Sequence, residues 1–336
     1  MDSLTQIVLG AAVAEKVLGK KIGNKAMLYG AIAGTIPDLD VISKFFVDPI
    51  RANELHRGFS HSILFCLLAA PILGWLVSKI EFKFKDVSWP DWSKLFFWGL
   101  FTHPLLDAHT AWGTQLFWPF DLRVAYKNIF VVDPLYTVPF LVFVILAMCY
   151  KRTNPKRTKF NNWGLIVSSA YMVFTIIFKG IGFYNVQKSL QDQGIAYMEI
   201  ETRPSPLNSI LWSAIVETEE AYLIGNYSLL DGRTPVTFIT FPKNYHLLGP
   251  AANESIIHRL IFLSQDMYIV ECADNNQLYF NDLRFGQSGM DDAEAEFIYS
   301  YKLDYVDGVL MATERPKTFE EGGKLLSELW IRIKGR

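Results

Sequence analysis

The sequence predicts an α-helical polytopic membrane domain in residues 1–184, followed by a small soluble α+β domain in residues 185–336. Hydrophobic residues make up 51% of the chain and charged residues 20%, which is more apolar than an ordinary soluble protein. Apolar runs at 61–80, 129–150 and 163–183 approach or reach the roughly 20 residues that a membrane-spanning helix needs. Near Asn185 the composition changes, and no later apolar run approaches that length.

Three shorter apolar segments, at 4–18, 26–42 and 95–106, are predicted as further helices of the membrane domain. Basic residues collect on the cytoplasmic side of a membrane protein. The most basic stretch, 151–159, and the lysine-bearing joints 16–25 and 79–94 therefore predict cytoplasmic turns. This count gives a multi-pass membrane protein with an extracytoplasmic C-terminal domain. Any short segment that re-enters the membrane instead of crossing it would reverse the orientation of everything before it.

Several classes of function are not supported by the sequence. A net charge of -2 provides no basic surface for nucleic acid, so none is expected as a partner. The three cysteines are widely separated, which indicates neither a disulfide framework nor a thiolate zinc site. No P-loop, dinucleotide fingerprint or Gly-x-Ser-x-Gly motif occurs. The first residues lack the basic segment and cleavage site of a signal peptide, so cleavage is not expected.

Candidate metal ligands form three short clusters in the first third of the chain. Carboxylates and imidazoles are costly in apolar surroundings unless they are paired or bind a metal. The topology count places all three clusters at the outer ends of their helices, so we expect one assembled site. Its predicted ligands are Asp38, Asp40, His56, His61, His103 and Asp107.

The first two clusters predict particular local structures. Pro37 disfavours helix at Ile36, and in extended backbone Asp38 and Asp40 would point the same way, whereas on a helix they would diverge. The alternative is a polar loop in which Asp38 caps a helix. Between the two histidines of 56–62, Gly58 permits a turn, and Ser60 is expected to cap the helix that follows. Arg57 is the predicted catalytic residue, a clamp for an anionic group; the alternative is a loop that meets lipid headgroups.

The third cluster has a helical spacing. His103 and Asp107 are four residues apart and would share one helix face, a pair suited to zinc, manganese or iron. Two alternatives stay open. Pro104 could start a new helix that leaves His103 outside, or Asp107 could orient His103 without binding the metal. His109 lies off this face and is expected to be structural.

These motifs resemble a known family. Pro37-Asp38-Leu39-Asp40, His56-Arg57-Gly58-Phe59-Ser60-His61-Ser62 and Thr102-His103-Pro104-Leu105-Leu106-Asp107, with Thr110 and Gly113, are similar to the YdjM-type bacterial inner-membrane proteins. A metal-dependent hydrolase activity is ascribed to that family. The resemblance covers roughly the first 150 residues and implies a polytopic inner-membrane protein with a divalent-metal centre.

One departure from the family concerns the N-terminus. Family members often have a histidine where this chain has Gln6, which is a poorer ligand for a transition metal, and Asp2 is a potential substitute. A more distant similarity of the His-x-x-x-Asp element to helical zinc phospholipases C and P1-type nucleases implies phosphoester substrates.

The second domain has strand and turn patterns. Strands are expected at 195–202, 210–217, 222–229, 268–272 and 277–281, with a hairpin turn at Glu219-Glu220 and another at Asp274-Asn275-Asn276. Helices are expected at 255–264 and 319–333. The polar elements 203–206 and 282–286 are expected to hold strand ends, the alternative being a roof over the metal site.

Three functions are compatible with these patterns. The first is a membrane-embedded metal-dependent hydrolase at the outer face of the inner membrane, with one to three divalent ions (zinc, or else manganese or iron). Its partners would be the lipid bilayer and a phosphoester or lipid-linked substrate. The second is a non-catalytic envelope protein with a structural metal site. A metal transporter is disfavoured because no internal repeat is found and the ligands map to one face.

Overall fold

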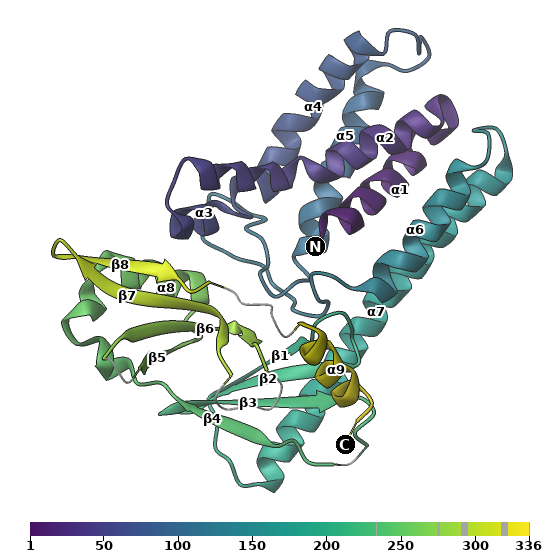
Figure 1. Cartoon of the computed structure of the whole chain (residues 1–336). Helices are drawn as coiled ribbons and strands as arrows, with labels where there is room; N and C mark the ends of the chain where they lie inside the picture. The colour runs from purple at the N-terminus through teal and green to yellow at the C-terminus, as the bar shows by residue number, and fades with distance from the viewer. Residues whose placement is uncertain (233, 274–275, 290–294, 317–321, 336) are drawn as a thin grey trace. The chain divides into compact units, whose positions relative to one another are not determined.

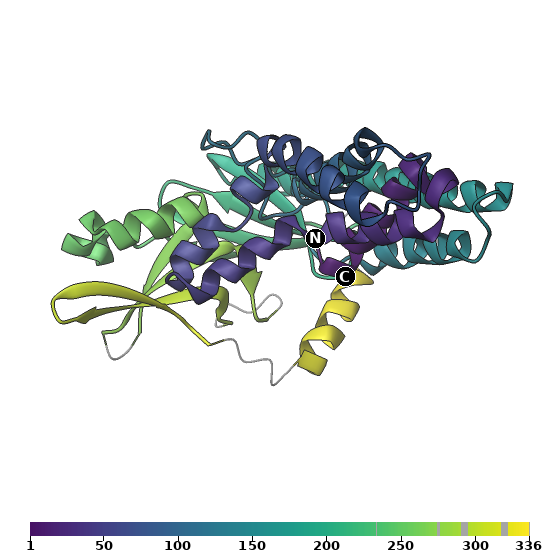
Figure 2. The ribbon, with the colours of Figure 1, turned by 90° about the horizontal axis from the view of Figure 1, so that it is seen from above.

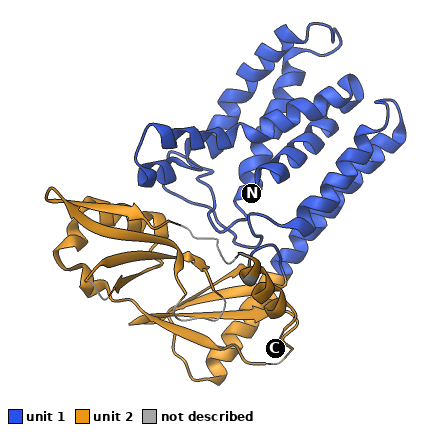
Figure 3. Cartoon of the chain, viewed as in Figure 1, with its two compact units in different colours: residues 1–177, 206–209 blue, residues 178–205, 210–336 orange. Residues whose placement is uncertain are grey.

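The computed structural model describes residues 1–232, 234–273, 276–289, 295–316 and 322–335. Two compact units are present (Figure 3), one formed by Met1–Ile177 with Pro206–Ser209 and the other by Phe178–Ser205 with Ile210–Arg336. The first unit is helical, and the second contains two antiparallel sheets. The division falls inside one long helix, α7, at Ile177–Phe178.

The helical unit is built from three helical hairpins that run side by side in both views (Figures 1 and 2). They are α1 (Ser3–Ile22) with α2 (Asn24–Thr35), α4 (Ile63–Ile80) with α5 (Trp89–Asp107), and α6 (Pro134–Met148) with α7 (Pro155–Asp192). Between the first two hairpins lie the short elements η1 (Pro37–Phe45), α3 (Pro49–Leu55) and η2 (Phe59–His61).

The turns of the three hairpins meet at one end of this unit. Lys21 Nζ lies 3.0 Å from Asp91 Oδ2, and Lys25 Nζ lies 2.6 Å from Glu81 Oε1, which connects the α1–α2 turn to the α4–α5 turn. Arg152, in the α6–α7 turn, donates to the backbone carbonyl of Lys21. We call this the basic end, and η1, α3 and η2 lie at the opposite end (Figure 1).

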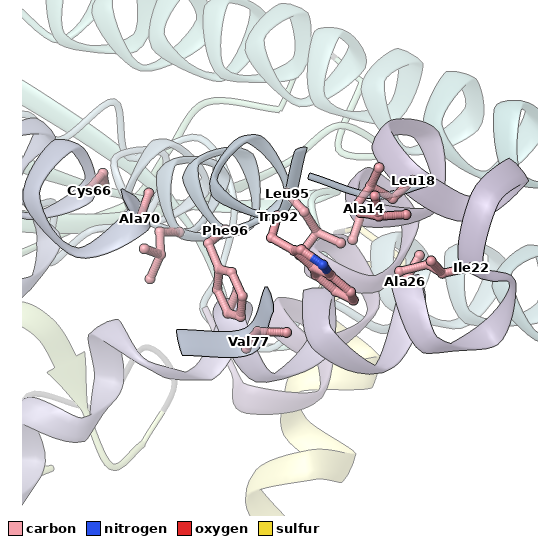
Figure 4. Packing of buried hydrophobic residues seen from close by; sticks show 13 residues of the cluster. Ala14, Leu18, Ile22, Ala26, Cys66, Ala70, Val77, Trp92, Leu95 and Phe96 are labelled. Atoms are coloured by element: carbon pink, nitrogen blue, oxygen red, sulfur yellow. The ribbon is translucent and has the colours of Figure 1, made fainter. Parts of the chain in front are cut away.

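Small residues let α1 and α2 approach closely. A Cβ on Gly10 would lie 2.2 Å from the backbone oxygen of Gly30, and a Cβ on Gly34 would lie 2.5 Å from that of Gln6. Such contacts are typical of helices that pack in membranes. Around this pair, Trp92, Leu95 and Phe96 of α5 pack with apolar residues of α1, α2 and α4 (Figure 4).

Among the described residues, two helices, α4 and α7, are long and apolar enough to cross a membrane by length and composition. The outer face of α4 exposes Leu67, Leu68 and Ile72, which suits contact with lipid. The predicted run 129–150 forms a helix only over Pro134–Met148, because Asp133 caps it and Pro134 takes its first position. Its 15 residues rise about 22 Å. In contrast, α1 has 20 residues and is longer than the predicted 4–18.

The C-terminal unit holds two four-stranded antiparallel sheets, each with its strands in chain order. The first contains β1 (Glu199–Pro204), β2 (Leu211–Glu217), β3 (Ala221–Ser228) and β4 (Phe238–Pro242); the second contains β5 (Tyr268–Cys272), β6 (Leu278–Gln287), β7 (Phe297–Val306) and β8 (Val309–Glu314). Helical elements are η3 (Tyr245–Asn253), α8 (Ser255–Ser264) and α9 (Gly322–Ile333).

Most of the predicted elements of this unit are present. The hairpin at Glu219-Glu220 is confirmed, with Glu217 opposite Tyr222, and the helix over Ser255–Ser264 has the predicted bounds. Asp274, Asn275 and residues 319–321 lie outside the described residues. The polar elements connect the two sheets, since Arg203 Nη2 donates to the backbone oxygen of Leu283 at 2.7 Å.

Candidate metal centre

The two aspartates of the first cluster lie on η1 and point in different directions. Ile36 has helical dihedrals (φ -58°, ψ -43°) in spite of Pro37, and Pro37 starts the 3₁₀ helix. The extended Asp-x-Asp prediction is therefore wrong. Pro37 occupies a first-turn position where no backbone N–H is needed, so helical structure continues past α2. As expected for a helix, Asp38 faces His61 and His103, while Asp40 faces His56 and the backbone of Arg57.

The second cluster is a compact turn before α4. Ser62, rather than the predicted Ser60, is the N-cap, because its side chain accepts from the backbone N–H of Phe65. His61 consequently lies just before the helix, in η2. Arg57 takes the left-handed conformation at φ 61°, while Gly58, expected to make the turn, keeps a negative φ. Ser60 Oγ donates to Asp40 Oδ2 at 2.9 Å, so the serine supports the aspartate instead of the helix.

The third cluster has the predicted geometry. α5 runs through Pro104 to Asp107, and His103 and Asp107 share one face with Nε2 and Oδ2 3.5 Å apart. His103 Nδ1 lies 2.6 Å from the backbone oxygen of Gly34. A carbonyl oxygen only accepts, so we assign the proton to Nδ1, which leaves the lone pair of Nε2 facing the cluster.

Four side chains converge at this point. Asp38, His61, His103 and Asp107 offer ligand atoms that all lie within 4.8 Å of one another. The two Nε2 atoms are 3.1 Å apart, each is 3.4 Å from Asp38 Oδ1, and each is 3.5 Å from Asp107 Oδ2. A tetrahedral zinc site with bonds near 2.0–2.1 Å has ligand atoms about 3.3 Å apart. The cluster can therefore hold a metal ion.

Asp40 and His56 lie behind these four. Asp40 Oδ2 is 3.3 Å from His61 Nδ1, and Asp40 Oδ1 is 2.8 Å from His56 Nδ1. Because a carboxylate accepts, this contact favours a proton on Nδ1 of His61 and directs its Nε2 toward the cluster. Carboxylate–histidine pairs of this kind orient the imidazole ligands of metal sites. Asp40 and His56 are thus adjacent to the four-residue cluster without belonging to it.

Asp107 is fully buried, and three groups from outside the cluster contact its carboxylate. Its Oδ1 contacts the amino group of Met1 and accepts from Gln6 Nε2 at 3.0 Å, while Arg57 Nε lies 3.2 Å from Oδ2. Among the described residues, no hydrogen bond reaches Oδ2, although the side chain is fully buried. A buried oxygen without a hydrogen bond is costly. Its position beside two imidazole nitrogens fits a metal ligand.

Carboxylates and imidazoles of the cluster shift each other's protonation. Burial disfavours the charged forms of Asp38 and His61, but hydrogen bonds between carboxylates and imidazoles outweigh it. They hold the pKa of Asp38 well below its ordinary value and raise the pKa of His61 to about 9. Asp40 is also held ionised, because hydrogen bonds from His56 and His61 exceed the effect of burial and lower its pKa.

Access to the cluster differs among its members. The side chains of His61, His103 and Asp107 are fully buried, whereas that of Asp38 is 23% exposed. The same η1 helix exposes the apolar residues Leu39, Val41, Ile42 and Phe45, and Phe46 directly after it is also exposed. The cluster is therefore reached from the side of η1.

Two partners of the cluster were not predicted. The backbone oxygen of Gly34 has no sequence signal of its own, although the small-residue spacing of Gly10, Gly30 and Gly34 marks the helix contact that positions it. Thr110 receives a hydrogen bond from Arg57 Nη1 at 2.8 Å, and it belongs to the motif that carries the family resemblance.

Other candidates have different roles. Asp2 caps α1 by accepting from the backbone N–H of Thr5, and His109 Nδ1 lies 2.8 Å from Asn128 Oδ1. Gln6 touches Asp107 through its amide nitrogen, and its Oε1 has no hydrogen-bond partner within the described residues.

The first unit is thus a helical domain of membrane-protein type that carries a buried histidine–aspartate cluster. The sequence model described as YdjM inner membrane protein matches residues 1–182, and the chain belongs to that family. It is therefore a membrane protein, as its apolar helices indicate. No curated protein matches the chain, and no solved structure does.

Proposed function

We propose that the protein is a multi-pass inner-membrane protein and a metal-dependent hydrolase whose centre lies at the outer membrane face. Support for the topology comes from the basic end of the helical unit, where the lysine- and arginine-bearing turns of all three hairpins meet. Basic turns favour the cytoplasmic side. The cluster, at the opposite end, then faces outward. The same orientation makes the C-terminal domain extracytoplasmic.

The proposed ligands are Asp38, His61, His103 and Asp107, which together hold one divalent ion. The observation that carries this proposal is the convergence of two imidazole Nε2 atoms and two carboxylate oxygens on one buried point, with each Nε2 3.1–3.5 Å from the other three atoms. Such a group of atoms is stable only where a proton or a cation lies among them, and a divalent ion would replace the proton that His61 holds in the metal-free protein. Two nitrogens and two oxygens with tetrahedral spacing favour zinc over larger, oxygen-preferring ions.

Catalysis is assigned to the residues around that ion. A bound divalent ion supplies Lewis acidity and makes water a nucleophile near neutral pH. Arg57 lies between Asp107 and Thr110, so its guanidinium holds Asp107 in place and offsets the negative charge that develops on a substrate. Asp38 faces the histidines with Oδ1 and its side chain is partly exposed, so its other carboxylate oxygen is the proposed proton acceptor.

The proposed substrate is an amphiphilic phosphoester, such as a lipid-linked phosphate. Asp38, the accessible member of the cluster, is carried by η1, where Phe45 is 75% exposed and Phe46, directly after the helix, is 81% exposed. An exposed apolar helix face of this kind suits burial in the membrane interface. A substrate anchored in the bilayer would thus reach the centre along η1.

Metal analysis and turnover test this function together. Full-length protein is purified in detergent, its metal content is measured by mass spectrometry, and release of phosphate from phospholipid and from lipid phosphate is followed. We expect one zinc per chain and turnover that His61→Ala abolishes along with the metal. His246→Ala, which removes an exposed histidine of the C-terminal unit, is expected to change neither.

The outcomes separate the functions. Stoichiometric metal without turnover of any phosphoester would support a structural site in a non-catalytic envelope protein. Protein that retains less than one equivalent of metal after reconstitution with zinc, manganese or iron would refute the metal centre itself.

A further inference from the structure

A cavity lined by both cationic and apolar side chains lies at the basic end of the helical unit, between the end of α1 and the start of α7. Its volume is about 920 Å³, within the roughly 300–1,000 Å³ typical of small-molecule sites. Three cationic side chains line it, Lys20, Arg152 and Lys159, and no acidic residue is among its lining residues. The cavity therefore favours an anion.

The two lysines of the cavity differ from their neighbours. Lys21 and Lys25, at the same end, are neutralised by Asp91 and Glu81. Within the described part of the chain, neither Lys20 nor Lys159 is in an ion pair. The nearby carboxylate of Glu15 is already engaged by Arg157, with Nε and Oε1 2.6 Å apart. The positive charge of the cavity is thus not balanced by the protein itself.

The wall provided by α7 changes from charged to apolar along the helix. Lys159, Trp163 and Ile166 follow the spacing i, i+4, i+7, so they share one helix face. The distance from Lys159 to Ile166 along the axis is about 10 Å. Trp163 is 47% exposed and Ile166 is 55% exposed. Along the helix, a cation is followed by an aromatic ring and then by an aliphatic side chain. This order matches the anionic headgroup, the glycerol region and the acyl chain of a phospholipid.

We propose that this cavity is a binding site for a phospholipid with an anionic headgroup, drawn from the leaflet that the basic end faces. The phosphate lies among Lys20, Arg152 and Lys159, where the first turn of α7 adds a helix N-terminus to the positive field. The hydroxyl of Thr158 and the amide nitrogen of Asn162 are available to the headgroup, while Asn162 Oδ1 accepts from Lys16 Nζ at 3.0 Å. One acyl chain packs on Trp163 and Ile166. Free phosphate would use the cations but gain nothing from this apolar wall.

Native mass spectrometry of the full-length protein in detergent tests the site, with phosphatidylglycerol and phosphatidylcholine of identical acyl chains as the probes. We expect tighter binding of phosphatidylglycerol. In the double variant Lys20→Gln/Lys159→Gln this binding should weaken about 30-fold, from about fivefold for each cation near an anionic lipid surface. Lys85→Gln is the matched control, since it removes an exposed lysine of the same end that does not line the cavity.

A second variant distinguishes lipid from free phosphate. Trp163→Ala is expected to weaken phosphatidylglycerol binding without changing the affinity for inorganic phosphate, so phosphate should displace the lipid from this variant at a lower concentration than from the native protein. The proposal is overturned if the double variant retains phosphatidylglycerol as well as Lys85→Gln does, or if millimolar phosphate displaces the lipid equally from native protein and from Trp163→Ala. An unchanged melting temperature and metal content show that each variant is folded, and neither readout depends on hydrolase activity.

Discussion

Buried charge is handled differently at the two ends of the helical unit. At the basic end, the guanidinium of Arg157 faces the carboxylate of Glu15, and Arg157 Nη1 donates to the backbone oxygen of Tyr150 at 3.0 Å. Each of these guanidinium nitrogens donates to an oxygen of the protein. At the opposite end, two imidazole nitrogens and two carboxylate oxygens point at one another. The first arrangement is complete within the protein, whereas the second is held together by a proton on His61 that a cation can replace, and such local conflicts are typical of functional sites.

The strongest test of this difference is Arg157→Ala. Arg157 is 1% exposed and Glu15 is 6% exposed, so the substitution leaves a buried carboxylate without its partner. Loss of one member of a buried ion pair costs about 3–5 kcal/mol. We expect a fall of this size in the free energy of unfolding in detergent, measured by chemical denaturation. Zinc affinity should stay unchanged because the centre lies at the other end.

The control for this variant is Lys25→Ala. Lys25 pairs with Glu81 at 2.6 Å, but its side chain is 46% exposed, and surface pairs contribute about 0–1 kcal/mol. If Arg157→Ala weakened zinc binding as much as it lowered stability, the two ends would not be independent, and the comparison would fail.

A second substitution tests a residue that contacts a proposed ligand without being one itself. Asp40→Asn keeps the shape of the side chain but removes the charge that orients His61. Loss of such an outer partner typically lowers metal affinity about 10–100-fold. We expect that range in a competitive zinc titration. Asp48→Asn is the matched control, because Asp48 caps α3 and asparagine is an equally good cap. Equal zinc affinity in the two variants would show that Asp40 does not contribute to metal binding.

Several features of the site followed from spacing alone. The i, i+4 pair of His103 and Asp107 needed only a continuous helix, which Pro104 did not interrupt. In the C-terminal unit the hairpin between β2 and β3 followed from alternation and a turn, both of which are local properties. Family membership was predicted from three motifs, and the match over residues 1–182 confirms it.

Other features depend on tertiary structure and could not be predicted. Asp38 and Asp40 point in different directions because η1 is helical. The sequence does not predict this helix, since a proline at position 37 disfavours helical backbone at Ile36. The acceptor of His103 Nδ1 is the backbone oxygen of Gly34, and every residue has such an oxygen. Its role arises because α1, α2 and α5 pack closely, which spacing within one helix does not specify.

The smallest expected effect concerns protons at the cluster. In the metal-free protein the carboxylates raise the pKa of His61 to about 9, so below that pH its ring is protonated and a metal must displace the proton. Affinity should therefore fall about tenfold for each pH unit below 9 through this group and level off above it. Asp38 and Asp40 keep their charge over this range because their pKa values are lowered.

Calorimetric zinc titrations between pH 6 and 9, each in two buffers of different ionisation enthalpy, give both the affinity and the number of protons released. Asp40→Asn removes one of the carboxylates that hold the proton on His61, so its affinity should fall less steeply toward low pH. The two proteins would then differ most at high pH, where orientation of the imidazole is the remaining advantage. If the zinc affinities of the two proteins changed with pH in parallel, Asp40 would orient His61 without raising its pKa. The difference between the cluster and the paired Arg157 would then depend on Asp38 and Asp107 alone.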